Sequence, residues 1–194
     1  LSQLWNGVWT LEQASNRGAP GIVVPDAPAP VSDRGSISVP DLVRRFPRLR
    51  YMGSKYALLP WIAEVLTEYQ FDSAIDAFAG SGAVAYLLKG MGKRVLANDF
   101  LALGETFAHA LIQNDGVQVD EELVADLVRY DPRAKQFIQR TFDGIFFSPA
   151  DLRFLDRVWW NLRRLSPSDP RRSLVLAALA RSCMKRQPRG VFTV

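Results

Sequence analysis

Cysteine and histidine are almost absent from this 194-residue sequence, which has one of each, Cys183 and His109. A single cysteine excludes an intrachain disulfide and favours a reducing compartment, so we expect a cytoplasmic protein. Because the two residues lie far apart in the sequence, we do not expect them to form a metal site. No apolar run approaches the roughly 20 residues that a membrane-spanning helix needs, and we therefore expect no membrane partner.

Positive charge is scarce over residues 1–132, which hold 11 Lys and Arg against 16 Asp and Glu. Residues 133–194 hold 13 against 4, and several phenylalanines and tryptophans lie among these cations. A basic segment with interspersed aromatics suits a polyanion such as nucleic acid. The same pattern also suits a solvated helical face whose aromatics belong to the core, and charge alone leaves both interpretations open.

Apolar periodicity predicts an α/β core. The predicted elements are helices at 55–70, 82–91 and 101–113, and strands at 73–78 and 94–98. This βαβα alternation is typical of a parallel, doubly wound sheet. Further helices are predicted at 120–130, 133–140, 149–165 and 170–185. Ser148 followed by Pro149 and Asp151 is a helix-start signal, and Asp169-Pro170 is another.

The composition divides the chain into three predicted segments. Residues 1–45 form an N-terminal arm with a Pro/Gly-rich linker, because residues 17–40 are rich in Pro, Gly and Ser without periodicity. Residues 46–118 form the α/β core, and residues 119–194 form a helical, basic segment, which under the nucleic-acid interpretation is a candidate DNA-facing insertion.

The stretch DAFAGSGAVAYLLKGMGKRVLANDF, residues 76–100, has the form of a nucleotide-like cofactor site. Gly80-x-Gly82-x-x-Ala85 formally matches the dinucleotide fingerprint of NAD enzymes. The stretch from Asp76 through Phe78 to Gly80-Ser81-Gly82 instead resembles the acid-x-Phe-x-Gly-x-Gly pattern of enzymes that use S-adenosylmethionine (AdoMet). A carboxylate at the end of the first strand suits a cationic sulfonium amino acid and repels a pyrophosphate, which favours AdoMet. The alternative is that Asp76 merely caps the turn.

Asp99, at the end of the second strand, can accept hydrogen bonds from both ribose hydroxyls of an adenosine. The neighbouring Phe100 offers a ring for the adenine. The glycines allow a sharp turn and close approach of a ligand to the backbone, and Ser81 between them is interpreted as a turn residue.

Upstream stands Arg50-Tyr51-Met52-Gly53-Ser54-Lys55, directly ahead of a predicted helix. It resembles the N-terminal AdoMet-binding motif of Dam-type DNA adenine methyltransferases, an aromatic-x-Gly-Gly/Ser-Lys. The order of this motif, the glycine turn and then Asn-Asp is similar to that family from Arg50 to about Asn114. The segment from Phe146 to Asp156 is also similar to part of some members.

The resemblance implies a Rossmann-like AdoMet-dependent methyltransferase fold, incomplete in this chain, and methyl transfer to the exocyclic amine of adenine in double-stranded DNA. By position, Tyr51 would pack against the cofactor and Lys55 would meet its methionine carboxylate. Asp76 and the Gly80–Gly82 backbone would hold the amino-acid end, and Asp99 the ribose. Without the resemblance, Lys55 is a surface lysine at a helix start, where the helix dipole favours an anionic partner.

The sequence departs from the family in one respect, because it contains no Pro-Pro. Members carry an Asp/Asn-Pro-Pro-aromatic catalytic loop that receives the flipped adenine. The nearest candidates, Asp131-Pro132-Arg133 and Asp169-Pro170-Arg171, lack the second proline and the aromatic. The family order places the loop after residue 194. We therefore expect an N-terminal part that needs a missing C-terminal part or a second polypeptide, binds AdoMet weakly and transfers no methyl group alone.

Three other functions stay open at this stage. One is an AdoMet-dependent RNA or small-molecule methyltransferase, the second is a non-catalytic module that binds DNA or a partner subunit, and the third is an NAD-dependent oxidoreductase. Cytosine C5 methylation needs a nucleophilic cysteine, and Cys183 lies on a predicted apolar helix, where we expect a structural thiol.

Overall fold

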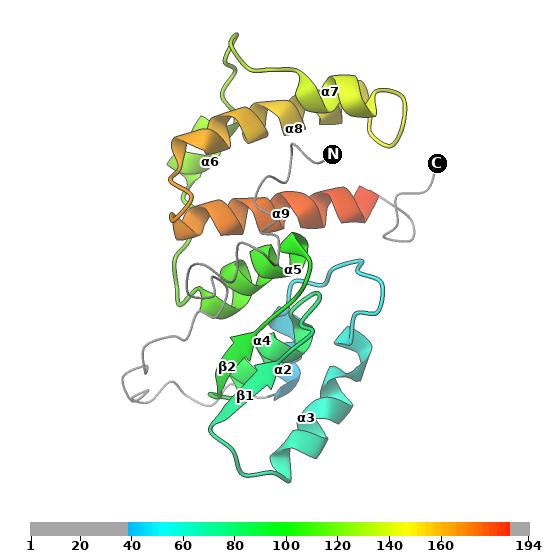
Figure 1. Ribbon diagram of the computed structural model, residues 1–194, viewed down its shortest axis with the longest axis vertical. Coiled ribbons are helices and arrows are strands. Elements are labelled where there is room, and N and C mark those ends of the chain that lie inside the picture. The colour runs from blue at the N-terminus through cyan, green and yellow to red at the C-terminus, as the bar shows by residue number, and fades with distance from the viewer. Residues whose placement is uncertain (1–38, 187–194) are drawn as a thin grey trace, which may run out of the picture. The chain divides into compact units, whose positions relative to one another are not determined.

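The computed structural model describes residues 39–186, which form two units (Figure 1). The first comprises residues 39–47 and 55–108, and the second comprises residues 48–54 and 109–186. The predicted core segment 46–118 is thus divided between them, and our domain boundaries stay a prediction. The predictions for residues 1–38 and for the last eight residues lie outside the described residues.

The first unit contains two parallel strands, β1 (Ser73–Asp76) and β2 (Arg94–Ala97), joined through helix α4 (Ala83–Gly90). Ser73 lies opposite Arg94, and Asp76 lies opposite Ala97. Because the strands are parallel and in register at their carboxyl ends, both ends open on the same edge of the sheet (Figure 1). The predicted βαβ unit is confirmed, whereas the doubly wound sheet and the wider Rossmann-like arrangement stay predictions.

Helix α4 packs on both strands and is the best-buried helix of this unit. Its buried residues are Ala83, Ala85, Leu87 and Leu88. Helices α2 (Val39–Arg45) and α3 (Leu59–Thr67), the latter preceded by the 3-10 turn η2 (Tyr56–Leu58), pack against it. Phe46 is 2% exposed between the rings of Tyr56 and Tyr86, whose centroids lie 6.0 and 5.5 Å away. The small residues of α4 let it lie close to the strands.

The opposite face of the strand pair is open in the described part of the chain. Successive strand residues point to opposite faces, and Asp76 hydrogen-bonds to α4. Ile75 therefore points away from α4, and its side chain is 71% exposed. An exposed β-branched residue on a strand is typical of a face that another element covers.

The chain passes from the first unit to the second within one irregular helix. The predicted helix 101–113 is confirmed as α5 (Ala102–Phe107) continued by the π-helix η3 (Ala108–Gln113). The unit boundary falls between Ala108 and His109, inside the π-helical turn. Such wider turns are rare and insert a residue into the helical ladder.

The second unit is helical. Its helices are α6 (Glu121–Val128), α7 (Phe137–Phe142), α8 (Pro149–Asn161) with the 3-10 turn η4 (Leu162–Arg164), and α9 (Pro170–Arg186). A core of Leu127, Val158, Leu162 and Val175 joins α6, α8, η4 and α9. The predicted start of α8 is confirmed as a capping box, in which Ser148 Oγ accepts from the Asp151 amide and Asp151 accepts from the Ser148 amide.

One predicted helix has the wrong bounds. The helix expected at 133–140 begins at Phe137 and ends at Phe142, because residues 131–134 form a turn instead. In that turn the Ala134 amide donates to the Asp131 carbonyl, and the Asp131 side chain accepts from the Arg133 amide. Aspartate competes for nearby backbone donors in this way and so favours turns over helix interiors.

Among residues 39–186, no helix is both long enough and apolar enough to cross a bilayer.

Candidate cofactor site

The carboxyl ends of β1 and β2 gather most of the predicted site residues. Asp76 ends β1, is half-buried, and its Oδ2 accepts a hydrogen bond of 3.2 Å from the Ala85 amide. Burial raises the pKa of Asp76, the Ala85 and Phe78 backbone hydrogen bonds lower it, and the charge of Asp99 raises it further. The net effect is upward, so the charged form of this carboxylate lies in an environment that favours an approaching cation.

The glycine turn follows directly and leads into α4. Gly80 and Gly82 have φ of 52° and 75°, in the left-handed region that side chains disfavour. Gly82 is the N-cap residue of α4, and its amide donates to the Ala79 carbonyl at 2.7 Å. Ser81 between them is 4% exposed, as suits a turn residue. The turn brings the first amides of α4 to the same edge as Asp76, where they favour an anionic group.

Asp99 connects the turn to α5. Its Oδ2 accepts from the Gly80 amide at 2.7 Å, and its Oδ1 accepts from the Leu101 amide at 2.9 Å. A Cβ on Gly104 would lie 2.6 Å from the Asp99 Cβ, so only glycine fits at position 104. Asp99 therefore holds the glycine turn in place, a structural task that we did not predict. Each carboxylate oxygen has a second acceptor direction, so the predicted ribose contact stays open.

Sequence reasoning missed Gly104, although a signal was available. A glycine inside a predicted helix costs about 1 kcal/mol relative to alanine, so it usually has a packing reason. Here that reason is close contact with the Asp99 side chain.

Two aromatic rings at this edge are almost fully exposed. Phe78 is 89% exposed and Phe100 is 97% exposed. Phe100 directly follows Asp99, and Phe78 lies between Asp76 and the glycine turn. Exposed phenylalanines next to paired carboxylates and a glycine turn are suited to stacking on a ligand or packing against another element.

The predicted aromatic-Gly-Lys motif is divided between the two units. Tyr51 and Gly53 belong to the second unit, where the Ser54 amide donates to the Tyr51 carbonyl at 3.1 Å and Gly53 has a φ of 78°. This segment is joined to α9, since Arg50 Nη1 donates to the Lys185 carbonyl at 3.2 Å. Lys55 belongs to the first unit as the exposed N-cap residue of η2. The structure thus brings together the predicted residues from Asp76 to Phe100, all within the first unit.

The other reactive residues have structural surroundings. Cys183 is partly buried on α9, and burial raises the pKa of its thiol. A raised pKa leaves little thiolate at neutral pH, which disfavours a nucleophilic role. His109 hydrogen-bonds Gln113 one turn along the π-helix. Within residues 39–186, no cluster of three or more His, Cys, Asp or Glu could hold a metal ion.

A family model for D12 class N6 adenine-specific DNA methyltransferases matches residues 51–184. The chain belongs to this family. The match covers Tyr51, the glycine turn, Asp99 and the helical unit as far as α9. This confirms the resemblance to the DNA adenine methyltransferases and shows that the chain is part of an enzyme family of this class.

A characterised relative agrees with this assignment. The D12-class chain is 28% identical over 153 residues to the Type II methyltransferase M2.HphI of Haemophilus parahaemolyticus. The match covers 77% of this chain and 44% of that relative, so the chain spans less than half of the relative's length. No solved structure matches the chain.

Both Asp-Pro-Arg segments of this D12-class chain form local ion pairs. Asp131 accepts from Arg133 Nε and Nη2 at 3.0 and 2.9 Å, and Asp169 accepts from Arg171 Nε and Nη2 at 3.1 and 2.7 Å. In each pair a bidentate arginine engages both carboxylate oxygens, so both aspartates act as local ion-pair partners in this structure.

Proposed function

We propose that this chain is the cofactor-binding part of an AdoMet-dependent enzyme that methylates the exocyclic amine of adenine in DNA. The observation that supports this most directly is the half-buried carboxylate of Asp76 at the end of β1, beside the left-handed turn that starts α4. A zwitterionic amino acid needs a carboxylate for its ammonium and amide donors for its own carboxylate. Asp76 and the first turn of α4 supply both at one sheet edge.

The carboxylate at the end of β1 also favours AdoMet over NAD. A pyrophosphate would lie against a carboxylate whose pKa is already raised by burial and by the charge of Asp99. A cationic amino-acid group would instead relieve that unfavourable environment. When bound, AdoMet supplies an electrophilic methyl group, and the residues of this chain bind and orient its amino-acid and adenosine ends.

The remaining roles follow the family resemblance. Asp99 accepts from the ribose hydroxyls, and Phe100, which is 97% exposed, presents a ring to the adenine. Tyr51 packs against the cofactor and Lys55 meets its carboxylate. Gly53, Phe78 and Ser81 complete the predicted site, with Ser81 acting through the turn rather than through a contact of its hydroxyl.

The catalytic loop is proposed to lie outside these 194 residues, since the sequence has no Pro-Pro and both Asp-Pro-Arg segments are ion pairs. The loop would be supplied by a longer form of the protein or by a second polypeptide. Adenine would have to leave the duplex to reach it, because its amine is paired inside the helix. The designation of the relative as a Type II methyltransferase is compatible with a restriction-modification role.

The first test is isothermal titration calorimetry of the purified chain with AdoMet. We expect weak but measurable binding to the wild type, and at least about tenfold weaker binding to Asp76→Asn, because a charge-assisted contact is worth about 1.5–3 kcal/mol. Asp72→Asn is the matched control, since this exposed aspartate lies just ahead of the same strand and has no proposed contact. The control should bind AdoMet as the wild type does.

Two outcomes would contradict the proposal. One is equal loss of affinity in Asp72→Asn and Asp76→Asn, and the other is preference of the wild type for NAD over AdoMet. Absence of any binding at millimolar AdoMet would favour a non-catalytic module.

A further inference from the structure

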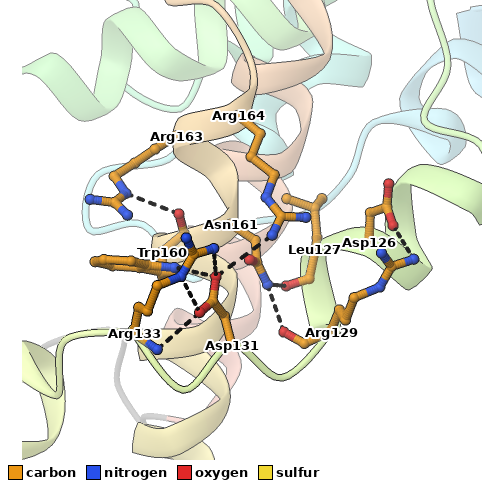
Figure 2. A network of polar contacts seen from close by, with 9 residues as sticks. All are labelled: Asp126, Leu127, Arg129, Asp131, Arg133, Trp160, Asn161, Arg163 and Arg164. Carbon is orange, nitrogen blue, oxygen red and sulfur yellow. Dashed lines mark hydrogen bonds and ion pairs between the residues drawn. The ribbon is translucent and has the colours of Figure 1, made fainter.

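The second unit contains a buried carboxylate, that of Asp131, which contacts two arginines. Asp131 follows α6, and its side chain is 7% exposed. It accepts from the Arg133 amide and guanidinium, and from Trp160 Nε1 of α8 at 3.1 Å (Figure 2). Arg164 of η4 approaches it as well, with Nη2 3.7 Å from Asp131 Oδ2. One carboxylate thus joins the loop after α6 to α8 and η4.

More than one arginine lies near Asp131, and these arginine side chains are exposed to solvent. The side chain of Arg133 is 78% exposed and that of Arg164 is 50% exposed. A third cation, Arg163, lies over the Trp160 ring with Cζ 3.3 Å from the ring centroid (Figure 2). Two guanidinium groups contact the buried carboxylate, and Arg163 is exposed beside them on Trp160. The cluster is therefore net positive and its charges face solvent.

The loop that carries Arg133 continues into an open groove of about 760 Å³. The groove is lined by Arg133, Ala134, Lys135, Gln136, Phe137, Arg140 and Thr141. A second buried acid holds its helical wall in place, because Asp156 of α8 accepts from the Ile138 and Gln139 amides at 2.7 and 3.0 Å. These are amides of the first turn of α7, which are otherwise unsatisfied within the helix. The groove is therefore both basic and held to α8.

We propose that Asp131 is a positioning residue that holds Arg133, Arg164 and the Trp160–Arg163 pair as a preformed contact surface for the phosphate backbone of DNA. This inference rests on the proposed function, which makes DNA the substrate. Guanidinium groups match phosphate oxygens in pairs, and an arginine already held by a carboxylate loses less freedom on binding. The groove beside Arg133 adds Lys135 and Arg140, which extends the positive surface along the loop and α7.

The direction in which Asp131→Asn changes DNA affinity separates positioning of the arginines from simple electrostatic attraction. Asp131→Asn removes a negative charge and deletes no arginine, so simple electrostatic attraction predicts tighter DNA binding. Positioning predicts the opposite, about five- to tenfold weaker binding, because the freed arginines must be ordered when DNA binds. Asp169→Asn is the matched control, since Asp169 stands in the same Asp-Pro-Arg arrangement with Arg171 but, among the described residues, accepts no hydrogen bond from a tryptophan. It should bind DNA as tightly as the wild type or more tightly.

The measurement is fluorescence anisotropy of an adenine-containing DNA duplex titrated with the 194-residue chain at several salt concentrations. Arg133→Gln should reduce the slope of log K against log salt by about 0.9, the value for one lost phosphate contact. Arg171→Gln removes the same charge and should leave the slope unchanged. These two variants keep the proposal testable if Asp131→Asn does not fold, which thermal melting would reveal.

The outcomes separate this inference from the proposed function. If Asp131→Asn binds DNA as well as the wild type, or if both arginine variants change the slope equally, the positioning role of Asp131 is wrong while the cofactor site stands. Tighter binding of an RNA duplex than of DNA would also overturn the inference. If the wild type binds no DNA, both the inference and the proposed substrate fail, and calorimetry with AdoMet on the same sample shows whether the cofactor site survives.

Discussion

At the scale of single residues, the proposed cofactor site depends on the environment of Asp76. This carboxylate ends β1 and is drawn toward α4 by its hydrogen bond with the Ala85 amide. Partial burial and, to a smaller extent, the nearby Asp99 raise its pKa above its ordinary value. A group held in this way is destabilised when charged and gains from a cationic ligand.

This environment gives AdoMet binding a pH dependence. The ammonium group of AdoMet needs the charged form of Asp76, so affinity should be full at neutral pH. It should fall as the pH drops through the raised pKa, at a higher pH than the usual carboxyl value of about 3.9. In the unliganded chain, protonation of Asp76 should stabilise the wild type relative to Asp76→Asn over the same interval, because protonation relieves the buried charge. The aspartates with lowered pKa values lose stabilisation equally in both proteins as the pH falls; they are Asp131, Asp151 and Asp169. Calorimetry across this range measures the first effect, and thermal melting measures the second.

The Asp76→Asn variant is the control for that dependence. Its weak residual binding should be nearly independent of pH over this interval. A wild-type profile as flat as that of the variant would show that Asp76 does not contact the cofactor.

At the scale of elements, α4 begins at the glycine turn of the proposed site and packs on both strands of the sheet. Left-handed glycines flank it at both ends, Gly82 with φ of 75° at the N-cap and Gly92 with φ of 78° just past its last residue. A Cβ would meet nothing within 4 Å at either position, so the need for glycine is conformational rather than steric. We therefore expect the two glycines to contribute similarly to stability. Gly82 lies near the carboxyl ends of the strands, whereas Gly92 lies just ahead of the start of β2.

This equivalence allows a matched pair of substitutions. Gly82→Ala and Gly92→Ala should each destabilise the chain by about 1–2 kcal/mol, the cost of a left-handed alanine. Only Gly82→Ala should also weaken AdoMet binding, because its turn presents the first amides of α4. Chemical denaturation and calorimetry measure the two effects, and equal loss of affinity in both variants would mean that the turn acts through stability alone.

At the scale of the whole molecule, the described residues hold one open sheet and one helical unit. Ile75, Phe78 and Phe100 are exposed around the strand pair. The chain covers 44% of the length of its relative M2.HphI. Exposed apolar side chains of this kind fit a sheet that is completed by further polypeptide.

The 194-residue chain alone should therefore transfer no methyl group. The measurement is incorporation of labelled methyl from AdoMet into an adenine-containing duplex, with a known adenine methyltransferase as the positive control. A longer form of the protein that includes an Asp/Asn-Pro-Pro-aromatic segment should be active in the same assay. Robust methylation by the 194-residue chain would contradict the proposal that the catalytic loop lies elsewhere.

Much of the local structure could be predicted from the sequence, because local signals act over a few residues. The Ser148 capping box, the βαβ unit around the glycine turn, and the helices at α4 and α8 depend on spacing, glycine conformation and side-chain caps. The family was likewise identified from three short motifs, and the family model confirms it. The predicted contacts of Tyr51, Lys55 and Asp99 with AdoMet stay predictions.

Only the tertiary structure decided which side chains meet. No local pattern indicates that Asp99 accepts from the Gly80 amide and packs against Gly104. Nor does one indicate that Asp131 contacts Trp160 and Arg164. The Gly80–Asp99 hydrogen bond joins residues 19 positions apart and the Asp131–Trp160 hydrogen bond joins residues 29 positions apart. Both depend on how helices and strands pack rather than on neighbouring residues. The sequence by itself determined the turns, caps and motifs, including the local pairing of Asp131 with Arg133. Packing determined the distant partners of the buried acids, because a carboxylate removed from water needs more donors than its neighbours in the sequence supply.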